Sequence, residues 1–100
     1  MIKHVVMWTF ADEAEGASKA QNLTESKARL EALGDLIPGI EGFEVAIAQD
    51  GLEHSHDQIL ISAFDSVQTL KAYATHPAHL EYVAWLTPRR TGRVVIDYEV

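Results

Sequence analysis

The segment that most constrains this fold is residues 2–10 (IKHVVMWTF), a strand pattern that is apolar on both faces. Its β-branched and aromatic residues are typical of a strand, and successive side chains of a strand point to opposite faces. One face carries Ile2, His4, Val6, Trp8 and Phe10, and the other carries Lys3, Val5, Met7 and Thr9. A central strand of this kind has to be covered on both sides. Whatever the chain folds into must therefore hide two faces of one sheet.

The first half of the chain supplies one helix after this strand. Residues 18–37 follow the helical period, with one apolar stripe formed by Leu23, Leu30, Leu33 and Ile37. Pro38 and Gly39 are expected to end the helix. Residues 43–49 (FEVAIAQ) then alternate as a second strand.

The second half of the chain also predicts strands and helices. Residues 58–64 (QILISAF) predict a third strand, joined to the second by the polar turn DGLEHSHD. Ser66 is placed to cap a helix that reaches about Thr75, and Pro77 fits the first position of a new helix. Residues 93–100 (RVVIDYEV) predict the last strand.

The resulting order, β-α-β-β-α-β, predicts a single α+β domain over residues 1–100. We expect a ferredoxin-like, four-stranded antiparallel sheet with its helices on one face. Helices can cover only that face, and a chain of 100 residues has nothing left for the other. A second copy would cover it, so the sequence predicts a homodimer whose two sheets meet in a closed barrel. The pattern leaves open whether the His4–Val6–Trp8 face or the Val5–Met7 face is the interface.

Charge and composition exclude several classes of function. The chain has 8 Lys and Arg against 15 Asp and Glu, a formal net charge of −7, and no basic stripe. Neither nucleic acid nor an anionic membrane surface is therefore an expected partner. There is no apolar run of the ~18 residues that a membrane span needs, no signal-peptide pattern and no cysteine. We expect a cytoplasmic protein.

Four segments resemble the stress-responsive dimeric α/β-barrel (Dabb) family: MIKHVVMWTF, IPGI, FDSVQTLKAYATHPAHLEYV and VVIDYEV. The most specific piece is the Tyr-x-x-His-Pro-x-His run at residues 73–79, together with Lys3 and His4. The resemblance implies a ferredoxin-like fold that dimerises through its sheets. The family includes plant stress proteins, bacterial members of unassigned role and plant polyketide cyclases, so the resemblance implies less about activity.

His4, Tyr73 and His79 are the candidate catalytic residues. The helix break between Tyr73 and His79 can turn both side chains toward one point, and a histidine near a helix N-terminus tends to stay neutral, as a base requires. A tyrosine O–H can hold a developing enolate oxygen. The resemblance implies a cofactor-free aldol closure in which His79 is the base, Tyr73 positions the substrate and His4 lines the pocket.

The candidate substrate-binding residues are Trp8, Phe10, Phe64 and His76, which would hold a small hydrophobic or aromatic ligand. Structural roles compete with all of these assignments. His4, Tyr73 and His79 could be buried groups with satisfied hydrogen bonds, His76 fits a helix cap, and the aromatic residues fit a core.

Two rival functions remain: a non-catalytic, stress-related dimer and a haem-handling or oxygenase-like protein. A pocket filled by Trp8, Phe10 and Phe64 would favour the first rival, and a haem-induced spectral shift would favour the second.

Two polar clusters have simpler explanations. Residues 53–57 (EHSHD) resemble a metal site, but they lie in a predicted hairpin loop with no second cluster, so we predict a solvated turn and no metal. Arg89, Arg90 and Arg93 form the single basic spot. A loop beside the last strand explains them, with an anion contact as the alternative.

Overall fold

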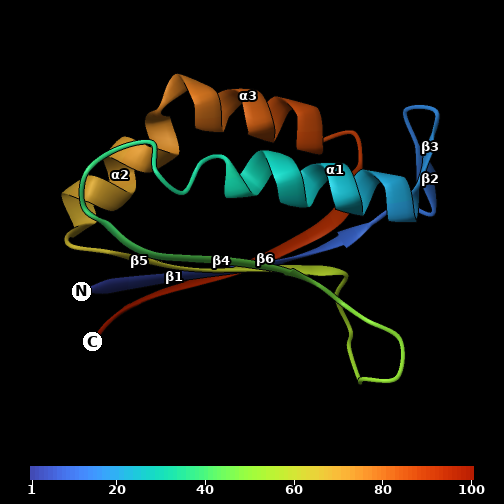
Figure 1. The fold of residues 1–100 in the computed structure, drawn as a ribbon, viewed down its shortest axis with the longest axis horizontal. Coiled ribbons are helices and arrows are strands. Elements are labelled where there is room, and N and C mark those ends of the chain that lie inside the picture. Colours follow the sequence, from blue (N-terminus) through green and yellow to red (C-terminus); the bar gives the residue numbers. More distant parts are fainter.

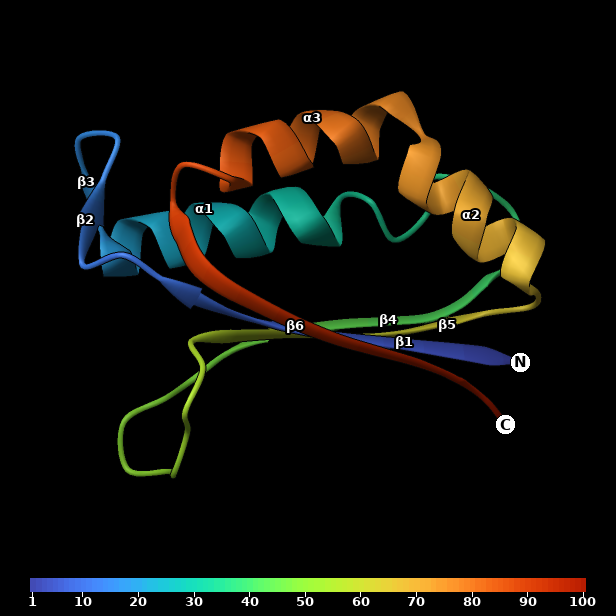
Figure 2. The same cartoon turned by 180° about the vertical axis from the view of Figure 1, so that it is seen from behind.

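The computed structural model describes residues 1–100 and has one four-stranded antiparallel sheet with three helices on one side of it (Figures 1 and 2). The elements are β1 (Ile2–Phe10), β2 (Glu13–Ala14), β3 (Ala17–Ser18), α1 (Lys19–Glu31), β4 (Ile40–Ile47), β5 (Gln58–Phe64), α2 (Val67–Thr75), α3 (Pro77–Leu86) and β6 (Arg90–Glu99). The strand order in the sheet is β4-β5-β1-β6. This confirms the predicted ferredoxin-like α+β fold. No helix is long and apolar enough to cross a membrane.

The first helix is shorter than its apolar stripe predicts, because α1 ends at Glu31 rather than at residue 37. Leu33 is nevertheless buried, and Ile37 packs against the core from the turns that follow. Gly34 explains part of the early end: a Cβ there would lie 3.2 Å from the Phe43 ring, so a glycine allows the turn to pack closely on β4. The helical period marked buried positions correctly but not the end of the helix.

The strand ends also differ from the sequence pattern. β4 covers residues 40–47 rather than 43–49, and β6 covers residues 90–99 rather than 93–100. Pairing explains the early starts, since Ile40 lies opposite Phe64 and Arg90 lies opposite Phe10. Backbone hydrogen bonding to a neighbouring strand extends a strand beyond its apolar residues.

A small hairpin, β2–β3, precedes α1 and was not predicted. It turns through Glu15 and Gly16, which both have positive φ (53° and 78°), as tight hairpin turns require. The hairpin delivers Ser18 to the N-cap of α1, where its side chain accepts from the Gln21 N–H. The Gln21 side chain accepts in return from the Ser18 N–H, which completes a capping box.

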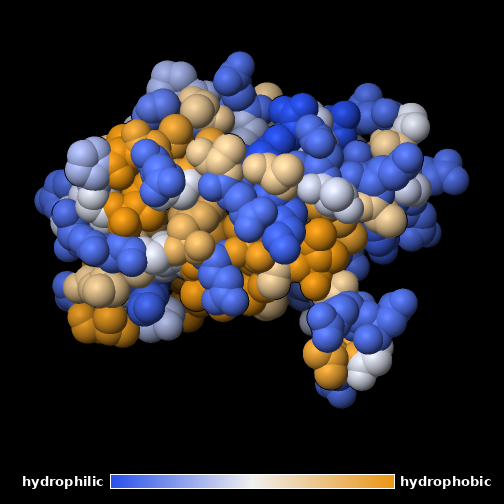
Figure 3. All heavy atoms as spheres, viewed as in Figure 1, coloured by the Kyte–Doolittle hydropathy of each residue, from blue (hydrophilic) through white to orange (hydrophobic).

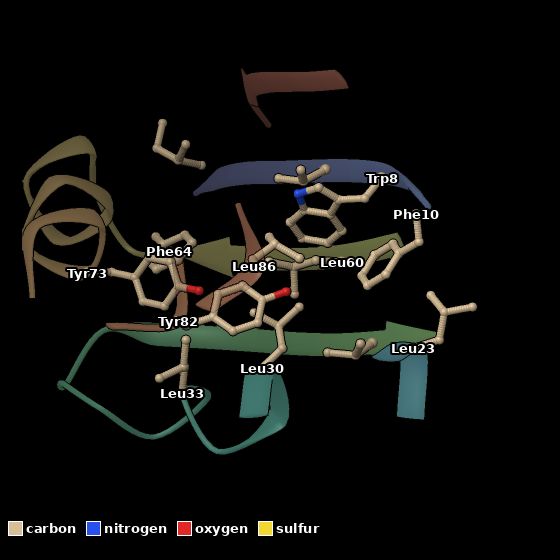
Figure 4. Close-up of a cluster of buried hydrophobic side chains, with 13 residues drawn as sticks. Trp8, Phe10, Leu23, Leu30, Leu33, Leu60, Phe64, Tyr73, Tyr82 and Leu86 are labelled. Carbon is tan, nitrogen blue, oxygen red and sulfur yellow. The ribbon is translucent and has the colours of Figure 1, made fainter. Parts of the chain in front are cut away.

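The hydrophobic core fills the space between the helices and one face of the sheet (Figure 4). Val6 and Trp8 are buried there, together with Leu60 and Phe64 of β5 and Tyr73 of α2. The structure thus shows which face of β1 the helices cover. The face of β1 that carries His4, Val6 and Trp8 lies under the helices, and the face that carries Val5 and Met7 does not.

The opposite face of the sheet, here called the open face, has no helix packed on it. Its side chains are aliphatic in two adjacent rows across the sheet, with Val5 between Ile61 and Ile96 and Met7 between Ile59 and Val94. The loop that joins β4 to β5 projects below this face (Figures 1 and 2). Figure 3 shows that loop standing clear of the body, with a hollow between it and the sheet.

Candidate functional site

The candidate site is built around the break between α2 and α3. His76 occupies the break with an extended backbone (φ −63°, ψ 137°) and is both the C-cap of α2 and the N-cap of α3. Its Nδ1 accepts from the Ala78 N–H at 3.1 Å, and Pro77 follows as the first helical residue. The predicted capping role of His76 is thereby confirmed.

The turn at His76 brings Tyr73 and His79 together, with their ring centroids 4.7 Å apart. Both rings line a cavity of about 300 Å³ that lies between α3 and strands β1 and β6, and His4 lines it from β1. Tyr82 of α3 and Trp8 of β1 form further parts of the wall. The structure therefore gathers the three candidate catalytic residues on one cavity.

His79 is held as a neutral base. Its Nδ1–H donates to the Ala74 carbonyl at 3.0 Å, which leaves Nε2 as the unprotonated nitrogen. Burial lowers the pKa of His79 below its ordinary value; the hydrogen bond to Ala74 opposes this effect, and the electrostatic influence of nearby His4 and Arg93 adds to it. An imidazole with a free lone pair at neutral pH can accept a proton.

Tyr73 is held as a hydrogen-bond donor. Its side chain is 1% exposed, its ring packs against Phe43 and Phe64, and its hydroxyl has no partner within the chain. Burial raises the pKa of Tyr73 well above its ordinary value of 10, so the hydroxyl stays protonated.

Tyr82 differs, because its hydroxyl is hydrogen-bonded to Ser26 at 2.9 Å. Burial raises the pKa of Tyr82 to about 12. Ser26 also donates to Gln58 Oε1 at 2.7 Å, so Tyr82 belongs to a buried structural network.

Asp97 is a site residue that the sequence reasoning missed. It lies opposite His4 in the register of β1 and β6, and its Oδ1 accepts from the His4 Nδ1–H at 2.5 Å. The pairing fixes the imidazole of His4 and leaves its Nε2 for a ligand. The available signal was Asp97 itself, the one acidic residue inside the apolar run VVIDY, but its partner depends on the strand register.

The other proposed binding residues fall in different places. Trp8 is on the cavity wall, and its indole N–H has no partner within the chain. Phe10 and Phe64 are fully buried in the core and do not line the cavity, although Phe64 supports the Tyr73 ring at a centroid distance of 5.2 Å. His76 does not line it either.

The polar loop at residues 53–57 is held mainly by hydrogen bonds among its own residues and their neighbours. His54 Nδ1 donates to the Leu52 carbonyl, and Ser55 is hydrogen-bonded to His56. Asp57 accepts from the Phe10 N–H at 2.8 Å, which ties the loop end to β1. No three His, Asp or Glu side chains of the protein are close enough to hold a metal ion together.

The three arginines of the basic spot have separate surroundings. Arg89 donates to Asn22 Oδ1 and to the Trp85 carbonyl, and its guanidinium lies 4.3 Å from the centre of the Trp85 ring. It therefore holds α1 and α3 together. Arg90 and Arg93, in contrast, line the cavity.

The sequence matches the model of a known protein family. Residues 2–100 match the stress responsive A/B barrel domain, Dabb. The chain belongs to the Dabb family. Across 99 residues it is 28% identical to the stress-response A/B barrel domain-containing protein HS1 of Arabidopsis thaliana, covering 98% of this chain and 88% of that one.

Solved structures agree with this assignment. A dimeric protein of unknown function with a ferredoxin-like fold, from Bacteroides fragilis, is 30% identical, with a TM-score of 0.84 over 99% of this chain and 95% of that one. SnoaB, a cofactor-independent oxygenase from Streptomyces nogalater, is 16% identical, with a TM-score of 0.74 over 99% and 91% of the two chains. At that identity the likeness to SnoaB shows a shared fold alone.

Proposed function

We propose that this Dabb protein is a cofactor-independent enzyme that removes a proton next to a carbonyl group of a small molecule. The observation that carries the proposal is the pairing of a fixed base with a fixed donor. The Nε2 of His79 is left free by the bond from Nδ1 to Ala74, and the unpartnered hydroxyl of Tyr73 lies on the same cavity, with 4.7 Å between the ring centroids.

The step uses these two groups directly. His79 Nε2 takes the proton from the carbon beside the carbonyl, and the electron pair of that C–H bond forms the enolate. The Tyr73 O–H donates to the oxygen on which negative charge develops. His79 then returns its proton to carbon. If the substrate carries a second carbonyl, the enolate carbon can instead attack it and close a ring, and the new alkoxide takes the proton.

His4 and Asp97 complete the site from strands β1 and β6. Because Asp97 fixes the imidazole through Nδ1, the Nε2 of His4 is presented to a ligand in one orientation. Asp97 acts through His4 and is a positioning residue.

We further propose that the protein is a homodimer that buries the open face. The support is the aliphatic composition of that face and the dimeric state of the similar Bacteroides fragilis protein. A contiguous exposed apolar surface of this kind is otherwise an aggregation liability.

Proton exchange tests the catalytic proposal. Aryl ketones and aryl β-keto esters are incubated in D₂O, and deuterium uptake at the carbon beside the carbonyl is followed by NMR. We expect exchange faster than in buffer, and His79→Asn should slow it by roughly 10²–10⁴-fold, the usual contribution of a positioned base.

His54→Asn is the matched control, since His54 also donates its Nδ1–H to a backbone carbonyl but lies in the β4–β5 loop. It should leave exchange and the melting temperature unchanged. If no compound exchanges faster than in buffer, or if His79→Asn exchanges as fast as the unmodified protein, the proposal is wrong.

A further inference from the structure

Two arginines on the cavity wall have no anionic partner. Arg90 and Arg93 form no ion pair, and no hydrogen bond of either guanidinium is present. By comparison, Arg29 of α1 pairs with Glu25. Asp97, the acidic group on the same face of β6, is already held by His4.

The two arginines are placed differently. Arg93 lies opposite Trp8 in the register of β1 and β6 and is exposed, whereas Arg90 is half-buried near the start of β6. Their charges therefore lie along the β6 edge of the cavity. Arg93 is also close enough to His79 for its charge to lower the pKa of that residue.

The interior of the same cavity carries donors without acceptors. The Trp8 indole N–H and the Tyr73 hydroxyl are buried and unpartnered within the chain, and both residues line the cavity. A buried donor without a partner costs free energy that an acceptor on a ligand recovers.

The rest of the wall is largely apolar and includes Val6, Leu60 and Leu86. The volume of about 300 Å³ is at the small end of the range of ligand pockets, roughly 300–1,000 Å³. We propose that the cavity is specific for a small carboxylate: its anionic end pairs with Arg93 and Arg90, its apolar body packs on these three side chains, and its carbonyl oxygen accepts from Tyr73 and Trp8. This inference deepens the proposed function by naming the substrate class of the same site.

Three related probes test the carboxylate and the carbonyl separately. They are 3-benzoylpropionate, its primary amide, and 4-phenylbutanoate, which keeps the charge but lacks the ketone. Binding is measured by NMR titration of the ¹⁵N-labelled protein, with the Trp8 and Trp85 indole signals assigned through Trp85→Phe. We expect the ketone carboxylate to bind about tenfold tighter than its amide, because charge-assisted hydrogen bonds are the stronger ones. The Trp8 indole proton should move downfield with the ketone and much less with 4-phenylbutanoate.

Arg93→Gln should remove most of the preference for the carboxylate over the amide, and Arg90→Gln should reduce it. Lys71→Gln is the matched control, because it removes one exposed positive charge from α2 away from the cavity. It should leave the preference intact. Equal binding of carboxylate and amide, or a preference that survives both arginine changes, would overturn the inference.

His79→Asn separates this inference from the proposed function. The variant should still prefer the carboxylate, although it no longer catalyses exchange. A carboxylate preference without any catalysed exchange would therefore reject the enzyme and keep the anion site. Catalysed exchange with no preference for the carboxylate would reject the anion site and keep the enzyme.

Discussion

The two faces of the sheet carry the same kind of strand pattern but different chemistry. On the covered face, Val6 and Leu60 alternate with polar residues such as His4, Ser62 and Gln58. On the open face, the central rows are aliphatic, apart from Glu44 on the edge strand β4. Polar groups in an interior need partners at fixed positions, whereas aliphatic side chains need only removal from water. The covered face lies under helices of the same chain, and the folded chain supplies such partners there: Asp97 for His4 and Ser26 for Gln58.

Exposure shows the same contrast. Leu60 is 2% exposed and its neighbour Ile61 is 37% exposed, although the two are adjacent in β5. Ile96, on the open face of β6, is 61% exposed. Folding of one chain covers the first face and leaves the second exposed. The site and the proposed interface are thus separated by the thickness of one sheet.

The largest expected effect comes from placing a charge on the open face. Val5→Asp should convert the protein from a dimer of twice 11.1 kDa to a monomer, or cause it to precipitate, because an unpaired charge buried in the interface costs several kcal/mol. Light scattering after size-exclusion chromatography measures the mass. Leu80→Asp, an exposed position of α3, is the control and should stay dimeric. A dimeric Val5→Asp, or a monomeric unmodified protein at micromolar concentration, would contradict the proposed interface.

Truncation of adjacent residues separates the two faces more finely. Leu60→Ala should lower the free energy of unfolding by about 2–5 kcal/mol, since it leaves a cavity in the core. Ile61→Ala should destabilise the protomer less and should mainly raise the dissociation constant of the dimer. Urea unfolding gives the first quantity and dilution during chromatography gives the second. Equal losses of unfolding free energy, with no change in dimer affinity, would mean that the open face is not an interface.

The smallest effect is the titration of His79 on the covered face. Its pKa is lowered by burial and by the charges of His4 and Arg93, so the acid limb of the exchange rate should lie below pH 6.5. As the pH falls through 6.5, His79 of the unfolded chain binds a proton before His79 of the folded chain does. The free energy of unfolding should therefore fall below pH 6.5 because of His79, and His79 should not lower it at higher pH. Arg93→Gln should raise the pKa of His79 without restoring it fully, because the burial remains. NMR titration of the His79 ring measures this, and a pKa above 6.5 would contradict the assigned causes.

Much of the fold was predictable from local patterns. Ser66, Pro77 and the apolar alternation of residues 2–10 and 58–64 act through their own backbone or through the nearest turn, so α2, α3, β1 and β5 appear where they were predicted. The end of α1 was not predictable in this way. It depends on how Gly34 meets the Phe43 ring, a contact between residues of different elements.

The same distinction applies to the candidate site. The composition of residues 73–79 indicated His79 and Tyr73, because a proline break has a local geometric consequence. The role of Asp97 could not be assigned, since its partner His4 lies 93 positions away and meets it only through the register of β6 on β1. Arg93 was recognisable as part of the basic spot, but its place opposite Trp8 follows from the same register.

The sequence alone determined that this chain must form a sheet with two apolar faces, because strand alternation is a property of the backbone and needs no tertiary contact. Only the tertiary structure decided which face the helices cover. Both sets of β1 side chains include apolar residues, and the choice between them depends on the summed packing of three helices that each contribute part of the core. That choice put His4 beside His79 and Tyr73, and it left Val5 and Met7 on the open face.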